Sequence, residues 1–132
     1  MDLNNFMESY AREITGQYSE YNNTVSIVIF PLPDERFQTV YGEKKHLDKY
    51  GRELIEFSSK VCEFDEDIDL KSLLEENTNF CHAKFSIVNG FIQVEASLFI
   101  DSATEDTVKE ALSEVANLAD EYEFKLTGAD VY

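Results

Sequence analysis

The chain has 132 residues, and 27 acidic residues against 11 Lys and Arg give it a formal net charge of −16. This charge argues against direct binding to nucleic-acid phosphates or to an anionic membrane surface, and any charged partner is expected to be basic. A hydrophobic content of 43% and a length typical of one domain predict a single domain over residues 1–132, without a membrane span or a signal peptide.

Hydrophobic periodicity predicts a helix and three strands in the first half of the chain. Residues 2–15 repeat apolar side chains at helical spacing, and Gly16 can end that helix. Tyr18 and Tyr21 follow in a polar linker. The three strands, rich in β-branched and aromatic residues, span residues 24–30, 36–41 and 52–63. A polar connection over 42–51 joins the last two.

Two further helices are predicted in the second half. The acidic segment 65–69 precedes a helix that ends near Thr78, because acids complement the macrodipole at a helix N-terminus. Its inner face holds Leu70, Leu73 and Leu74. The last helix begins at Ser102 or Thr104, both with cap chemistry, and ends at Gly128. Its apolar stripe comprises Val108, Ala111, Leu112, Val115, Leu118, Ala119 and Tyr122. Its outer face comprises Glu105, Asp106, Glu110, Glu114, Asp120, Glu121 and Glu123.

Between these helices lies the strongest local signal, Asn89-Gly90, since a two-residue type I′ turn needs positive φ at both positions. The turn fixes the register of a hairpin within residues 81–100. Its apolar rungs pair Ile87 with Ile92, Phe85 with Val94, Ala83 with Ala96 and Cys81 with Leu98. The other face pairs Val88 with Phe91, Ser86 with Gln93, Lys84 with Glu95 and His82 with Ser97. A slip of one residue would bury Lys84 and Glu95, so the register is well specified.

These elements predict an α+β fold of order αβββαββα. Its antiparallel five-stranded sheet has the N-terminal and C-terminal helices packed on it and the middle helix at the side or in a dimer interface. All five glycines, at positions 16, 42, 51, 90 and 128, fall on predicted element boundaries, which agrees with this order.

No catalytic constellation is recognisable in the sequence, so we expect no enzyme, no catalytic residue, no cofactor and no metal. Cys62 and Cys81 fit a reducing compartment with free thiols. Cys81 and His82 are adjacent in a predicted strand and therefore point to opposite faces. This weakens both a zinc site that includes Cys62 and a Cys–His nucleophile pair.

Two charged segments have a functional alternative. Acidic side chains occupy positions 1, 3, 5 and 12 of a calcium loop, at Asp65, Asp67, Asp69 and Glu76. Leu70 stands where such a loop needs Gly, so we interpret the segment as a solvated helix start. The basic segment around His46 contains Lys44, Lys45, Lys49 and Arg52. We interpret it as a soluble hairpin connection, with an anion site as the alternative.

Apolar residues on both faces of two strands point to a partner. Val88, Phe91 and Phe99 lie on the polar face of the hairpin or at its tip, and they are the predicted partner-binding residues. The strand at 24–30 likewise has Val28 and Phe30 opposite Ile27 and Ile29. If helices cover one sheet face, apolar surface remains on the other and marks a binding site. The alternative is that a helix or a second subunit covers it.

Three segments between Leu70 and Asp120 resemble the YbjN-type proteins and the wider superfamily of type III secretion chaperone-like folds. They are Leu-Lys-Ser-Leu-Leu-Glu-Glu-Asn, the hairpin Ala-Lys-Phe-Ser-Ile-Val-Asn-Gly-Phe-Ile-Gln-Val-Glu-Ala-Ser-Leu, and the last helix up to Ala119-Asp120. The resemblance implies a small cytoplasmic αβββαββα domain. Secretion chaperones of this fold are typically homodimers that hold an effector segment in extended form, whereas YbjN-type members are described as regulators.

We therefore predict a non-enzymatic, cytoplasmic protein-binding module, chaperone-like or regulatory, that forms a homodimer. It binds a protein or peptide partner, neither nucleic acid nor membrane, on apolar sheet surface. The alternative is an inhibitor or immunity-type protein whose acidic face, chiefly the last helix, masks a basic partner.

Overall fold

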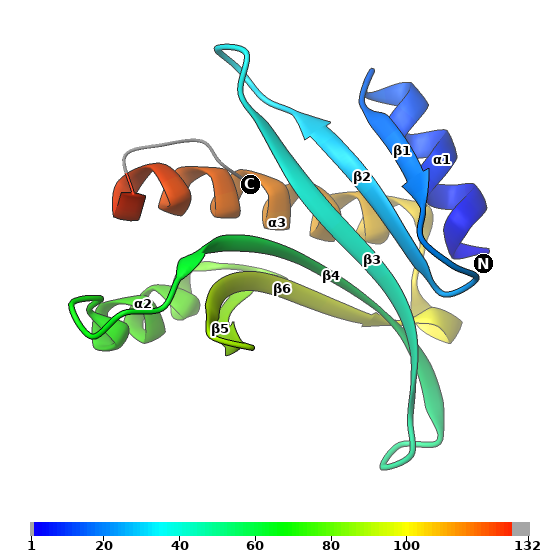
Figure 1. The fold of residues 1–132 in the computed structure, drawn as a ribbon. Coiled ribbons are helices and arrows are strands. Elements are labelled where there is room, and N and C mark those ends of the chain that lie inside the picture. Colours follow the sequence, from blue (N-terminus) through cyan, green and yellow to red (C-terminus); the bar gives the residue numbers. More distant parts are fainter. Residues whose placement is uncertain (1, 128–132) are drawn as a thin grey trace.

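The computed structural model describes residues 2–127 and contains, within them, three α-helices and a six-stranded sheet (Figure 1). The elements are α1 (Leu3–Glu13), β1 (Gln17–Glu20), β2 (Val25–Pro31), β3 (Phe37–Leu47), β4 (Arg52–Glu63), α2 (Leu70–Glu76), β5 (Lys84–Val88), β6 (Phe91–Phe99) and α3 (Glu105–Thr127). The sheet is antiparallel throughout, with strand order β1-β2-β3-β4-β6-β5. The α+β class is therefore confirmed.

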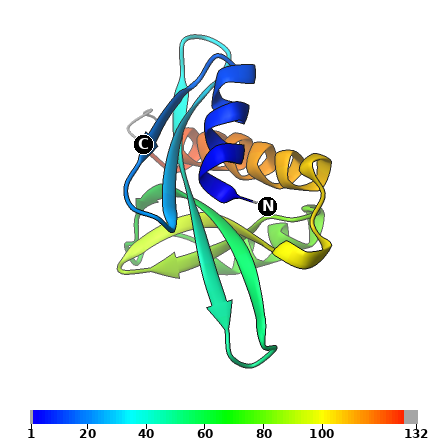
Figure 2. The same cartoon turned by 90° about the vertical axis from the view of Figure 1, so that its right-hand side faces the viewer.

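The helices α1 and α3 pack on one face of the sheet, here called the inner face (Figure 2). Residues alternate along each strand, so every second side chain enters this core. The fully buried strand side chains include Val28, Val40, Ile55, Phe57, Val61 and Val94. On α3 the predicted stripe is buried at Val108, Ala111, Leu112, Val115 and Ala119. No helix among residues 2–127 has the length and apolarity needed to cross a membrane.

The prediction of five strands was wrong, because a sixth strand, β1, forms in the segment predicted to be a polar linker. Its four residues, among them Tyr18, pair with β2 in the register Gln17 to Ile29. Three of the four are exposed, so the strand lacks the apolar alternation that would have revealed it. The chain reverses before β1 through Thr15, which has a φ of +60°.

The second predicted strand was too short. β3 continues through Gly42 to Leu47 and makes a long hairpin with β4, where a polar connection was expected. The polar side chains are compatible with a strand because Lys45 and Glu56 pair across it at 3.0 Å. Gly42 is needed inside the strand, since an added Cβ would lie 2.9 Å from Met7 Cε and 3.2 Å from the Phe57 ring.

The hairpin of β5 and β6 has the predicted register, from Val88–Phe91 at the turn to Lys84–Glu95. Asn89 and Gly90 both have positive φ, at 51° and 80°. The three outer rungs, which pair Cys81, His82 and Ala83 with β6, were wrong because β5 begins at Lys84.

The paired ladder between β3 and β4 ends at Tyr41 and Ser58, and the two strands then diverge over α3 (Figure 1). Buried polar side chains satisfy the backbone acceptors there. Ser59 Oγ donates to the Thr39 carbonyl at 2.6 Å, and Gln38 Nε2 donates to the Lys60 carbonyl at 3.0 Å. The fully buried Gln38 side chain is therefore part of the sheet's own hydrogen bonding.

Two helix ends were predicted with partial success. Thr104, one of the two candidate caps, accepts the N–H of Thr107 at 3.2 Å and begins α3. The predicted stop at Gly128 lies outside the described residues. At the end of α1 the residue with left-handed backbone is Thr15. The N–H of the next residue, Gly16, donates a hydrogen bond to the Ala11 carbonyl at 2.7 Å.

We expect Thr15→Gly to raise the free energy of unfolding by about 0.5–1 kcal/mol. The left-handed backbone strains a β-branched residue, and glycine relieves this strain. The relief is larger than the entropy cost of ordering the more flexible glycine on folding. Urea denaturation measures the change. The matched control, Gly16→Ala, should destabilise, since its Cβ would lie 2.5 Å from the Ile29 carbonyl oxygen. A Thr15→Gly variant less stable than the parent would contradict this account of the turn.

Candidate functional site

The face of the sheet opposite α1 and α3, here called the outer face, has an apolar patch on β2 and β3. Ile27 faces Tyr41 across the two strands, and Pro31 faces Phe37. Phe37 and Tyr41 are 40% and 38% exposed, and Ile27 and Ile29 are half-buried. Their neighbours Val28 and Phe30 point into the core. We call Ile27, Ile29, Phe37 and Tyr41 the outer patch.

The alternation at residues 27–30 predicts that one sheet face keeps apolar surface. Two residues of the outer patch, Ile27 and Ile29, belong to this alternation. Within residues 2–127 the helices that contact β2 and β3 do so from the inner face (Figure 2). Phe37 and Tyr41, which complete the patch, were missed as binding candidates. Their alternation with Gln38 and Val40 was the available signal.

The structure does not gather the three predicted partner-binding residues into one site. Val88 and Phe91 pair at the tip of the β5–β6 hairpin, where Val88 is 41% exposed. Phe99 lies eight residues along β6, about 26 Å away for an extended strand. There the Arg52 guanidinium lies 3.7 Å from the Phe99 ring centroid, and the Tyr50 ring contacts it edge-on. Phe99 is therefore partly covered by its own chain.

A second apolar surface lies where α2 meets the edge strand β5. A groove of about 270 Å³ is lined almost wholly by apolar side chains, which are Leu70, Leu73, Leu74, Phe85, Ile87 and Ile92. Leu74 is 65% exposed and Ile87 is 47% exposed. The prediction that Leu74 faces the core was wrong, because the short α2 covers the core with Leu73 and turns Leu74 outward. We call this surface the edge groove.

The acidic face predicted on the last helix is smaller than expected. Asp120 and Glu123 are 6% and 0% exposed, so their assignment to the outer face was wrong. Asp120 accepts hydrogen bonds from Arg36 Nε at 3.1 Å and Nη2 at 3.0 Å, which ties the loop before β3 to α3.

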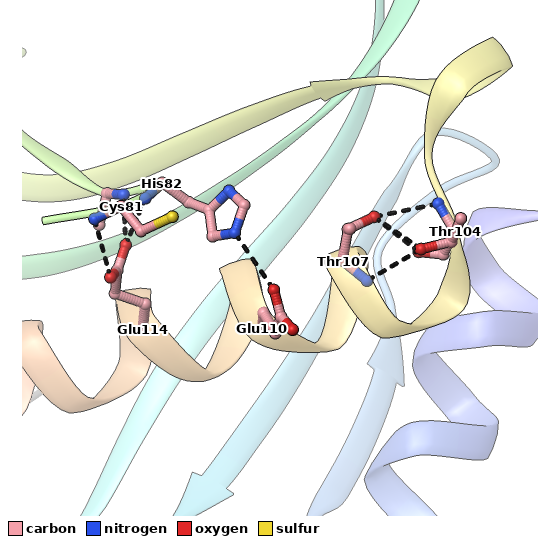
Figure 3. Close-up of polar contacts among 7 residues, drawn as sticks. Cys81, His82, Thr104, Thr107, Glu110 and Glu114 are labelled. Atoms are coloured by element: carbon pink, nitrogen blue, oxygen red, sulfur yellow. Dashed lines mark hydrogen bonds and ion pairs between the residues drawn. The ribbon is translucent and has the colours of Figure 1, made fainter.

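Glu114 does not contribute to an open acidic face on α3 either, because its side chain binds the backbone before β5 (Figure 3). Its carboxylate accepts the N–H groups of Cys81 at 3.1 Å, His82 at 2.7 Å and Ala83 at 2.6 Å. Burial opposes the charge, but the three donors outweigh it and hold the pKa of Glu114 below its ordinary value. His82, predicted to face Ser97, instead lies 3.5 Å from Glu110 on α3.

The acidic segment and the cysteines were the other candidates for a metal or catalytic site. Asp69 caps α2 by accepting the Ser72 N–H, and Asp65 accepts the Asp67 N–H. Both cysteines are free thiols, with Cys62 buried and Cys81 exposed. Among residues 2–127 no three His, Cys, Asp or Glu side chains converge closely enough to hold a metal ion.

The basic segment forms the far end of the β3–β4 hairpin, where three of its cations pair with carboxylates. Lys44 lies 3.4 Å from Glu53, Lys45 lies 3.0 Å from Glu56, and Arg52 binds Asp101. These three cations lie in β3 and β4, so the ion pairs belong to the strand ends and not to the polar connection that was expected.

No family model matches the chain, and no curated protein matches it. Two solved structures share its fold. A chain of the ExsC–ExsE complex is similar with a TM-score of 0.64 and 17% identity, over 94% of this chain and 92% of that chain. A chain of the HopA1–SchA chaperone–effector complex is similar with a TM-score of 0.59 and 14% identity, over 90% and 91%. At these identities the likeness shows the fold alone.

We expect Glu114→Gln to lower the free energy of unfolding by about 1–2 kcal/mol at pH 7, because an amide accepts the three N–H donors more weakly than a carboxylate. A depressed pKa stabilises the fold above the ordinary carboxyl pKa, and this contribution disappears as pH falls through the folded-state value. The difference between parent and variant should therefore be full above about pH 5 and shrink in acid.

Urea denaturation at a series of pH values measures this gap. Glu110→Gln, on the same helix but exposed, serves as the matched control and should change stability by less than about 0.5 kcal/mol. A gap for Glu114→Gln that stays constant from neutral to acid pH would exclude a role for the carboxylate charge.

Proposed function

We propose that this protein is a non-enzymatic, chaperone-like binding module that holds a segment of a protein partner in extended form on the outer patch. The supporting observation is that Phe37 and Tyr41 of β3 are exposed beside the half-buried Ile27 and Ile29 of β2, on a sheet face that no described helix covers. Contiguous exposed apolar surface is uncommon on soluble monomers and usually marks an interaction site.

The shape of the patch favours an extended partner. Ile27 and Ile29 stand two residues apart on β2. On β3, Tyr41 lies opposite Ile27, and Phe37 lies opposite Pro31, two residues beyond Ile29. An extended segment presents alternate side chains at the same spacing, so its apolar side chains fit between these rows. The net charge of −16 then favours association with a basic partner.

The chaperone-like fold agrees with this function, since one of the two similar chains belongs to a chaperone–effector complex. A more specific assignment as a YbjN-type regulator, a cytoplasmic location and a single domain over the whole chain stay predictions. The alternative of an acidic inhibitor also stays a prediction. It is weakened because Glu114, Asp120 and Glu123 are engaged or buried and do not form an open acidic face.

We further propose that two copies associate through the edge groove. Its exposed residues are Leu74 and Ile87. A self-complementary contact of this groove with its copy would bury both, as the interface of a two-fold dimer requires. The outer patch lies at the other end of the sheet and stays accessible in such a dimer.

For the outer patch, the double variant Phe37→Ser/Tyr41→Ser should lose its partner in pull-down from native lysate with mass spectrometry. Loss of two aromatic anchors typically weakens binding by two orders of magnitude or more, about 3 kcal/mol. Phe124→Ser is the matched control, because Phe124 is 56% exposed on α3, on the other side of the sheet. Equal recovery by both variants would refute the assignment.

For the dimer, the parent should sediment as two copies, and Leu74→Lys or Ile87→Lys should convert it to a monomer by placing a charge in the interface. Tyr21→Lys, at a 75% exposed position near the opposite sheet edge, should leave the dimer intact. A parent that is monomeric at high concentration would refute the proposal.

A further inference from the structure

A groove between α1 and the first turns of α3 combines an aromatic floor with acidic walls. It lies on the helix side of the molecule, away from the outer patch, and has a volume of about 380 Å³. Its floor is formed by Phe6 and Tyr10, stacked with ring centroids 5.9 Å apart and nearly buried. Its walls hold the carboxylates of Asp2, Glu13 and Glu105.

The groove already holds one cationic group, contributed by the chain itself. Lys109 Nζ lies 2.9 Å from Glu13 and 5.6 Å from the Tyr10 ring centroid. The hydrogen bond that Lys109 donates to the Glu13 carboxylate raises the pKa of Lys109, with further contributions from Glu105 and Asp106. Carboxylates and an aromatic face together are the chemistry that binds an ammonium or guanidinium group.

The charges of the groove are unbalanced, since three carboxylates line it against the single ammonium of Lys109. The Lys109 side chain is one-third exposed and can leave the groove without any change in the backbone. A second cation would therefore find an acidic wall at Glu105 and an aromatic face at Tyr10, with Lys109 as its competitor.

We propose that this groove binds an arginine or lysine side chain of a protein partner, which displaces Lys109 from Glu13 and Tyr10. The excess of negative charge on the walls favours a cationic occupant. The aromatic floor favours a side chain with a flat cationic group, as in arginine, or with an apolar stem, as in lysine. The inference rests on the proposed function only in taking the partner to be a protein. It adds a basic side chain to the apolar contacts expected on the outer patch.

The test is a titration of the full chain with N-acetyl-arginine amide, followed by ¹H–¹⁵N NMR. The amides of Ser9, Glu13, Glu105 and Lys109 should shift together and saturate with one dissociation constant. N-acetyl-citrulline amide, which has nearly the same shape but no charge, is the matched control and should not shift them. Equal shifts with both probes, or no shift with arginine, would overturn the proposal.

Two variants separate a specific site from general attraction to an acidic protein. Lys109→Met keeps the aliphatic stem and removes the competitor, so it should tighten arginine binding about threefold or more. Glu105→Gln should weaken it by a similar factor and leaves the Lys109–Glu13 pair in place, so the fold is retained. Unchanged affinity in both variants, or equal shifts at Asp65–Asp69, would mean non-specific attraction and overturn the proposal.

The outer-patch experiment is independent of this one. If Phe37→Ser/Tyr41→Ser loses its partner but arginine does not bind the groove, only this inference is overturned. If arginine binds the groove but capture of the partner does not depend on the outer patch, only the proposed function is overturned.

Discussion

The packing of α3 across the inner face of the sheet is the constraint on which the other features depend. Ala111, Ala116 and Ala119 are fully buried, and these small side chains let a 23-residue helix lie close against β3, β4 and β6. With α1 beside it on the same face, the core of the described residues lies on that side of the sheet. The outer face is left to solvent or to a partner.

Polar contacts fix the position of this helix relative to the loops around it. Near its middle, Glu114 holds the backbone that enters β5 (Figure 3). About 1.7 turns later, Asp120 holds Arg36 in the loop before β3. The same helix therefore orients the strand that borders the edge groove and the strand that forms the outer patch. Glu114 and Asp120, which were assigned to a charged outer face, therefore help to hold the fold together.

The sequence predicted those elements whose local signals agree with their packing. The Asn89-Gly90 turn set the correct register of β5 and β6, and β4 was predicted with its full bounds. β1 was missed because an edge strand of four mostly exposed residues has no hydrophobic pattern. The burial of Asp120 and Glu123 was missed because it depends on contacts with distant segments, such as that of Asp120 with Arg36, which no local pattern encodes.

The binding role of the three predicted residues stays a prediction, but they do not form one contiguous surface. Val88 and Phe91 lie at the tip of the β5–β6 hairpin and Phe99 at the other end of β6, whereas the contiguous apolar patch is on β2 and β3. The reason is that contiguity across strands depends on registers between distant segments. The chaperone-like fold, in contrast, was expected from the resemblance of the second half of the chain and agrees with the two similar structures.

Site-specific photo-crosslinking in cells tests the central claim most directly. A benzophenone side chain at position 41 should form covalent adducts with one partner protein, and peptide mapping should place them along a single extended segment of it. The same group at position 124, on α3, should form few. Adducts from position 124 together with none from position 41 would contradict a binding surface on the outer face of the sheet.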